Sequence, residues 1–136
     1  MDAANTATVA ITCKVTYDAT NDVYSLACTP KDAAAPTGVS NVQLVFTIDQ
    51  TGTSGGWTFQ PVKSRIGQAD YYFGITIFND PGVEPQFDDA EMSQLGRVVT
   101  LTDLNSNTTK YTYAVVLQNL GLQRLVMVDP TIKNNN

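Results

Sequence analysis

Apolar and polar residues alternate along much of the chain, and this alternation predicts β-strands. Within 41–49, the apolar side chains at positions 42, 44, 46 and 48 share one parity, which is the period of a strand with one buried face. Pro61 indicates a strand at a sheet edge, because proline has no N–H to donate to a neighbour. The strand-like runs, separated by turn-forming residues, are 7–17, 23–28, 41–49, 57–63, 71–78, 97–102, 110–118 and 122–128.

One short helix is predicted between residues 88 and 96. Asp88 has the chemistry of an N-cap, and Glu91 follows three residues later, which is the capping-box spacing. Met92 and Leu95 then lie at helical spacing, and Gly96 supplies a C-terminal stop.

About eight short strands without crossover helices predict an all-β fold, an immunoglobulin-like antiparallel β-sandwich. A closed β-barrel is the alternative. The 136 residues fit one domain, residues 1–136, with flexible ends at 1–5 and 133–136. The run 110–118 looks like the strand that begins with a tyrosine corner. We therefore expect Tyr111 or Tyr113 to be buried, with its hydroxyl bonded to main chain.

Two cysteines fall on the first predicted hairpin. If Tyr17 lies opposite Tyr24, then Cys13 lies opposite Cys28 on the same face of the strand pair. A cross-strand disulfide or redox pair is one interpretation. The other, which we favour because the sequence shows no secretory signal, is two buried thiols that pack as small apolar groups.

Composition and charge exclude several classes of protein. The net charge is −5 and the eight Lys and Arg residues are scattered, so binding to nucleic acid or to an anionic membrane surface is not expected. No apolar run approaches the roughly 20 residues that span a bilayer. The N-terminus has neither a basic region nor a continuous apolar region. We therefore expect a cytoplasmic protein, unless a leader has been removed.

The chemistry available to the chain argues against an enzyme. The sequence contains no histidine, which removes Ser-His-Asp and Cys-His sites and histidine-bearing zinc sites. It also shows no phosphate-binding or dinucleotide-binding glycine motif. We expect no cofactor.

The segment 79–91 carries the densest group of candidate functional residues. Five carboxylates fall within twelve residues, and Pro81 and Pro85 favour extended conformations for the residues before them. Ca²⁺ takes about six to eight oxygen ligands from flexible acidic loops, but a solvated loop that sets turns explains the same residues. We expect a shaped recognition loop without a bound metal ion.

Trp57, after a Gly-rich loop, is either a stacking platform or a core residue. The candidate binding residues are Asp80, Pro81, Gly82, Glu84, Pro85, Asp89 and Trp57.

Three functions are compatible with this reading of the residues. The favoured one is a non-enzymatic binding or self-assembly module, whose partner is another protein or a second copy in a homo-oligomer. The alternative is a Ca²⁺-assisted carbohydrate-binding domain that uses the acidic loop and Trp57. The third is a histidine-independent hydrolase with a carboxylate pair such as Asp80 and Glu84.

Two segments carry a family resemblance. The stretch 78–85 contains Asp80-Pro81 and Glu84-Pro85 in succession, and with the ending 128–134 it resembles the DP-EP family of small bacterial proteins. This resemblance implies a single-domain bacterial β protein from a family without an established activity. The ending is also similar to that of bacterial inclusion-body proteins, which implies self-association. Neither resemblance supplies a catalytic residue.

Overall fold

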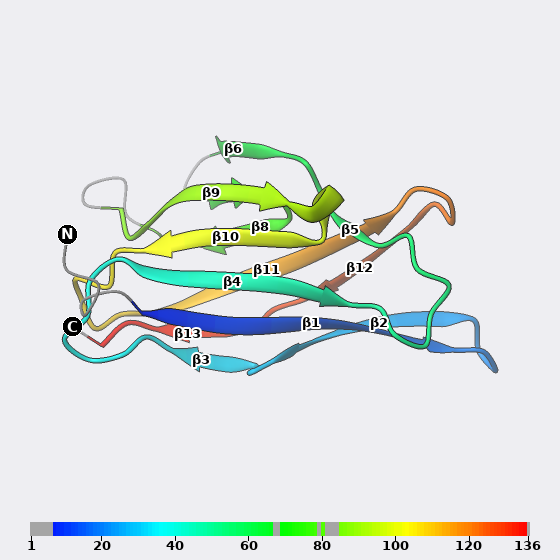
Figure 1. Cartoon of the computed structure of the whole chain (residues 1–136), viewed down its shortest axis with the longest axis horizontal. Coiled ribbons are helices and arrows are strands. Elements are labelled where there is room, and N and C mark those ends of the chain that lie inside the picture. The colour runs from blue at the N-terminus through cyan, green and yellow to red at the C-terminus, as the bar shows by residue number, and fades with distance from the viewer. Residues whose placement is uncertain (1–6, 67–68, 79, 81–84, 136) are drawn as a thin grey trace.

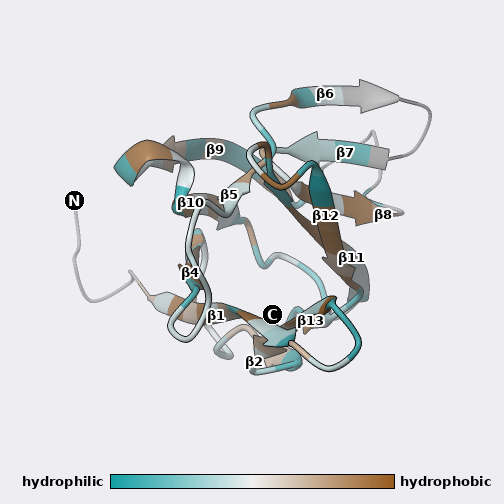
Figure 2. Cartoon of the chain, turned by 90° about the vertical axis from the view of Figure 1, so that its right-hand side faces the viewer, coloured by the Kyte–Doolittle hydropathy of each residue, from teal (hydrophilic) through white to brown (hydrophobic). Residues whose placement is uncertain are grey.

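Two β-sheets pack face to face in the computed structural model of the chain, which describes residues 7–66, 69–78, 80 and 85–135 (Figures 1 and 2). The first sheet has the strand order β2-β1-β4-β10-β9. In that order its strands are Val23–Thr29, Thr8–Asp18, Val42–Asp49, Val98–Asp103 and Phe87–Ser93.

The second sheet follows the order β3-β13-β11-β8-β7-β6, and both β12 and β5 also pair with β11. Its main strands are β3 (Asp32–Ala34), β13 (Thr131–Lys133), β11 (Lys110–Asn119), β8 (Ile75–Phe78), β7 (Ala69–Tyr72) and β6 (Lys63–Ile66); β12 is Arg124–Val128 and β5 is Thr58–Phe59. The neighbours β4-β10-β9 and β13-β11-β8 match the two sheets of an immunoglobulin-like sandwich. The predicted all-β sandwich is confirmed.

The core lies between the sheets and follows the period of two. Along β4, Leu44 and Phe46 point inward, and along β11 the inward residues are Tyr113, Val115 and Leu117. The rings of Phe46 and Tyr113 meet edge to face across the sandwich, with centroids 5.7 Å apart. Each such fully buried side chain contributes about 1.5–3 kcal/mol through removal of apolar surface from water.

Both sheets of the predicted sandwich are mixed, because each contains one parallel strand pair among the described residues. Strand β1 runs parallel to β4, and β3 runs parallel to β13. The cause is the N-terminal hairpin: β1 pairs with β2 on one side and with β4 on the other. The chain crosses to the second sheet at β3 before it returns to β4, and this crossover lets β4 follow the direction of β1.

The predicted helix at 88–96 is wrong. Residues Phe87–Ser93 form the edge strand β9, and only a short 3₁₀ turn, Gln94–Gly96, follows. Met92 lies opposite Val99 in β10. The backbone N–H and C=O groups of β9 therefore form hydrogen bonds with a neighbouring strand, where a helix would have paired them within itself. Short apolar spacings of three or four residues are ambiguous between the two structures, and tertiary pairing decides here.

The last described residues of the chain pack against the end of the sandwich. Asn134 is fully buried, its N–H donates to the Thr109 carbonyl oxygen at 3.0 Å, and Asn135 Nδ2 donates to the Ala35 carbonyl oxygen at 2.8 Å. Residues 133–135, expected to be flexible, thus make specific contacts with the rest of the domain, while residues 1–5 and 136 lie outside the described part. No helix among the described residues has the length and apolar character needed to cross a membrane.

Candidate functional site

A short strand pairs with the C-terminal end of β11, and the chain separates from β11 at Gln60. This strand, β5, pairs with β11 through Phe59 opposite Leu117. The chain then continues as β6 further out, and the β7–β8 hairpin fills the space between β6 and β11 (Figure 2). Pro61 stands where the two parts separate, a position at which its missing N–H costs no ladder bond. We refer to this arrangement as the strand fork.

A two-residue turn, Phe73-Gly74, forms the tip of the hairpin inside the fork. Both residues have positive φ angles, 52° and 85°, as a type I′ hairpin turn requires. The Gly74 carbonyl oxygen accepts a 2.8 Å hydrogen bond from the N–H of Val116. A Cβ atom at Gly74 would lie 2.6 Å from the Val116 carbonyl oxygen. Only glycine therefore fits at position 74.

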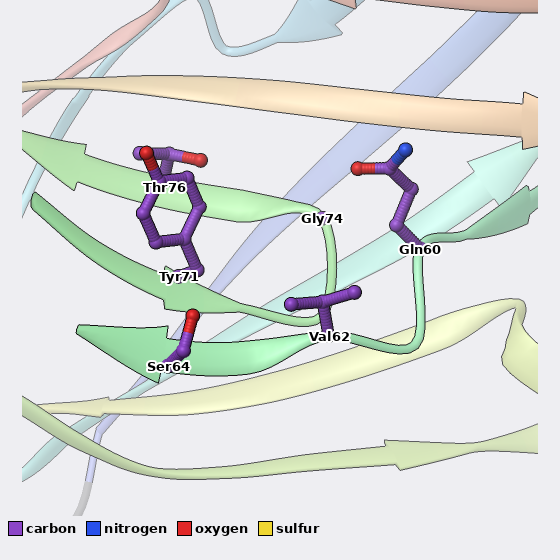
Figure 3. A pocket seen from close by; sticks show the side chains of 6 residues that line it. All are labelled: Gln60, Val62, Ser64, Tyr71, Gly74 and Thr76. Carbon is purple, nitrogen blue, oxygen red and sulfur yellow. The ribbon is translucent and has the colours of Figure 1, made fainter. Parts of the chain in front are cut away.

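A pocket of about 280 Å³ opens at the fork (Figure 3). Tyr71 lies opposite both Ser64 and Thr76 in the strand register, so these three side chains form one row on the outer face of the sheet. The other lining residues come from the fork itself. We refer to the set Gln60, Val62, Ser64, Tyr71, Gly74 and Thr76 as the fork pocket.

The described lining residues of the fork pocket carry no charged side chain. Gln60, Ser64 and Thr76 provide an amide and two hydroxyls, which both donate and accept hydrogen bonds. Val62, 51% exposed, and the Tyr71 ring provide apolar surface. An apolar cavity with a few convergent polar groups is the usual form of a binding site. The pocket can therefore hold a ligand, and among its described lining residues only Tyr71 has an ionisable side chain.

Apolar side chains continue from the pocket across the outer face. Val116, whose N–H bonds to Gly74, lies opposite Met127 of β12. Met127 is 62% exposed and its neighbour on the same face, Leu125, is 64% exposed. We refer to Val62, Val116, Leu125 and Met127 as the apolar strip.

A second, polar depression of about 440 Å³ adjoins β6 on the side of the first sheet. Asp89 and Glu91 of β9, Lys63 of β6 and Thr100 of β10 line it together with Gln43, Ala90 and Thr102. Asp89 has a φ of 52° and lies where the register between β9 and β10 shifts. This β-bulge redirects the edge strand, as bulges near functional sites often do. We refer to this depression as the polar groove.

Among the described residues of the predicted acidic loop, Asp80 and Asp89 lie in different surroundings. Asp80 is 1% exposed, and its carboxylate accepts hydrogen bonds from the N–H groups of Gln86, at 2.8 Å, and Phe87, at 3.2 Å. Asp80, predicted as a binding residue of the loop, is therefore buried and holds the start of β9 in place. Pro85 is exposed, and Asp89 lies in the polar groove. Pro81, Gly82 and Glu84 lie outside the described residues.

The aromatic candidates are core residues. Trp57 is fully buried, with its ring 5.2 Å from that of Tyr24, so it is not a stacking platform. Tyr111 and Tyr113 are both buried. The Tyr111 hydroxyl accepts a 2.9 Å hydrogen bond from the side-chain amide of Asn107, where the tyrosine corner predicted a main-chain partner. The hydroxyl of Tyr113 is buried without a partner among the described residues.

The predicted cysteine register is confirmed. Tyr17 lies opposite Tyr24 and Cys13 opposite Cys28 in the β1–β2 pair. Both thiols are free and buried, and their sulfur atoms are 4.0 Å apart.

A buried carboxyl lies at the end of the sandwich where the chain terminates. Asp103, at the end of β10, is fully buried, and its Oδ1 accepts a 3.0 Å hydrogen bond from the N–H of Asn105. Its Oδ2 has no hydrogen-bond partner among the described residues. Burial raises the pKa of Asp103 to about 6, because the charged form loses hydration.

Within the described part of the chain, no three Asp, Glu or Cys side chains form a group that could hold a metal ion. No protein-family model matches the sequence, and no curated protein matches it. The function must therefore be argued from the geometry alone.

Sequence reasoning missed the fork pocket entirely. Its lining residues are ordinary strand residues, and only the fold brings residues 60–64 beside residues 71–76. One signal was present: Gly74 interrupts the apolar run 71–78, and an isolated glycine in a strand pattern can mark a turn or a close backbone approach.

Proposed function

We propose that this chain is a non-enzymatic binding module that holds an uncharged segment of a partner protein on the outer face of its second sheet. The fork pocket is the centre of this surface and the apolar strip extends it. The observation that carries the proposal is the lining of the pocket, which combines exposed apolar surface with three neutral hydrogen-bonding side chains.

The chemistry of the surface fits an extended peptide. Gln60, Ser64 and Thr76 can pair with backbone N–H and C=O groups, which every peptide presents. Val62 and Met127, both more than half exposed, can bury apolar side chains of the partner, worth roughly 25 cal/mol per Å² removed from water. A strongly acidic partner is disfavoured, because the chain itself carries a net charge of −5.

A catalytic role has less support. General acid–base catalysis needs an ionisable group within hydrogen-bond reach of the substrate. The buried carboxylates of Asp80 and Asp103 accept hydrogen bonds from backbone N–H groups, and neither lines the fork pocket.

We also propose a cytoplasmic location, where free thiols such as Cys13 and Cys28 remain reduced.

Substitution of Val62 tests the proposal. Uncharged peptides are first selected from a displayed random library against the wild-type domain, and their affinities are measured by calorimetry. Val62→Asp should weaken their binding at least about tenfold, because it places a charge in the apolar contact. Val23→Asp is the matched control, since Val23 is 47% exposed on the other sheet. Equal affinities for the two variants would contradict the proposal. A dimer of the wild type that Val62→Asp dissociates would identify the partner as a second copy.

A second candidate function is carbohydrate binding in the polar groove. The groove places two carboxylates, an ammonium, an amide and two threonine hydroxyls around one depression, and sugar hydroxyls both donate to and accept from such groups. In affinity electrophoresis through a gel containing soluble neutral polysaccharide, the double variant Asp89→Asn, Glu91→Gln should lose any retardation, while Val62→Asp should keep it. Wild-type protein that migrates unretarded would rule this candidate out.

The resemblance to the DP-EP family also remains a proposal. Of its two dipeptides, Asp80-Pro81 and Glu84-Pro85, only Asp80 and Pro85 lie in the described part of the chain. The Asp80 carboxylate accepts hydrogen bonds from the N–H groups of Gln86 and Phe87, which gives Asp80 a structural reason for its place before β9.

A further inference from the structure

Cys13 and Cys28 face each other on the buried face of the first sheet, where its edge strand β2 pairs with β1. They are register partners in the antiparallel β1–β2 pair, and their sulfur atoms are 4.0 Å apart. Cys13 is 0% exposed and Cys28 is 7% exposed. Both are free thiols. The pair belongs to neither the fork pocket nor the polar groove.

The backbone already has the spacing that a cross-link requires. Directly opposed residues in antiparallel strands have Cα atoms about 4.5–5.5 Å apart, and disulfides form at Cα separations of about 4.4–6.8 Å. Rotation of the two side chains can bring the sulfur atoms to bonding distance while the ladder stays in place. Strand β1, which carries Cys13, is also paired with β4 on its other side, and this pairing fixes the position of its backbone.

We propose that Cys13 and Cys28 form a reversible thiol–disulfide pair that responds to hydrogen peroxide. The Cys28 sulfur attacks one peroxide oxygen, the O–O bond breaks, and the departing hydroxide takes up the thiol proton as water. The product is a sulfenic acid at Cys28. The Cys13 sulfur then attacks the Cys28 sulfur, the S–O bond breaks, and hydroxide leaves as a second water with the Cys13 proton. Two thiols are oxidised by two electrons and one peroxide is reduced to two waters.

The two cysteines have different roles in this sequence. Cys28 is the more exposed of the two, and its hydrogen bond with the Cys13 thiol lowers the pKa of Cys28. The pKa of Cys13 is raised, first by the same hydrogen bond and then by burial. Because the thiolate is the reactive form, Cys28 reacts with peroxide and Cys13 resolves the sulfenic acid. Hydrogen peroxide is small enough to reach these two buried sulfur atoms, whereas the active site of an oxidising enzyme is not.

Mass spectrometry of the folded protein tests the proposal. The wild type is exposed to hydrogen peroxide and then denatured in an alkylating agent. Its mass should fall by about 2 Da, the two thiol hydrogens, with both cysteines protected from alkylation until dithiothreitol is added. Cys13→Ala cannot form the bridge, so its Cys28 should gain about 32 Da as the sulfinic acid. Wild-type protein that keeps two alkylatable thiols, or that gains oxygen and forms no bridge, overturns the proposal. The wild-type result decides the question even if the variant fails to fold.

Discussion

Replacing Gly74 by Ala should destabilise the protein by about 3 kcal/mol or more, the sum of a backbone and a packing penalty. The backbone penalty arises because Gly74 has a φ of 85°, where an L-residue costs roughly 1–2 kcal/mol. The packing penalty arises because the added Cβ would lie 2.6 Å from the Val116 carbonyl oxygen and 3.1 Å from the Gln60 nitrogen. Both neighbours are backbone atoms of the fork, so relief requires the strands to separate.

Gly52→Ala separates these two contributions. Gly52 has a φ of 88°, but nothing lies within 4 Å of an added Cβ. It should therefore lose only the backbone part, about 1 kcal/mol. The free energies of unfolding of both variants and the wild type are measured by urea titration. If Gly74→Ala loses no more stability than Gly52→Ala, the close approach of the hairpin tip to β11 is refuted.

Replacing Asp103 by Asn should stabilise the protein at pH 7 and remove part of its pH dependence. In the folded state the pKa of Asp103 is raised from 3.8 to about 6. The folded protein therefore binds more protons than the unfolded chain between these values, and stability falls as pH rises through the folded pKa. At pH 7 a shift of this size lowers the free energy of unfolding by about 3 kcal/mol. Below the pKa of the unfolded state this loss is absent.

Urea unfolding of both proteins at several pH values between 4 and 7.5 measures this effect. At pH 7 the free energy of unfolding of the variant should exceed that of the wild type. This difference should shrink toward pH 4, where the carboxyl is protonated in the folded state. The carboxylates of Asp18, Asp22 and Asp49, whose pKa values are lowered by hydrogen bonds, act in the opposite direction. Because both proteins contain them, they cancel in the difference. A difference that stays constant with pH would contradict the assignment.

The sequence predicts well where a strand has one buried face. In β4, the alternation of Val42, Leu44, Phe46 and Ile48 identifies the inward side, and all four are buried. The β1–β2 register also follows from local information, because a short turn joins the strands and a slip by one residue would expose Cys13 and Cys28.

Prediction fails where distant strands decide the outcome. Residues 87–93 have a capping-box spacing, yet they pair with β10, whose inward residues Val99 and Leu101 are core. The apolar run 71–78 predicts one buried strand, but the turn at Phe73-Gly74 divides it into β7 and β8. Only the presence of β11 on one side and β6 on the other explains this division.

The candidate site could not be predicted for the same reason. The sequence directs attention to charged and aromatic residues such as Asp80 and Trp57, and the fold buries both. The fork pocket lies instead where a strand leaves its neighbour, among residues such as Val62 and Thr76 that have no distinctive chemistry of their own. A site made of neutral side chains leaves little trace in composition or spacing.

The location of a bound peptide tests the proposed function most directly. An uncharged peptide selected on the wild-type domain is titrated into isotope-labelled protein, and backbone amide shifts are followed by NMR. We predict the largest changes at the amides of residues 60–64, 71–76 and 114–118, which surround the fork pocket and begin the apolar strip. The largest changes in the loops 50–57 and 120–123, with the amides of the fork unmoved, would contradict the proposal that the strand fork is the binding site.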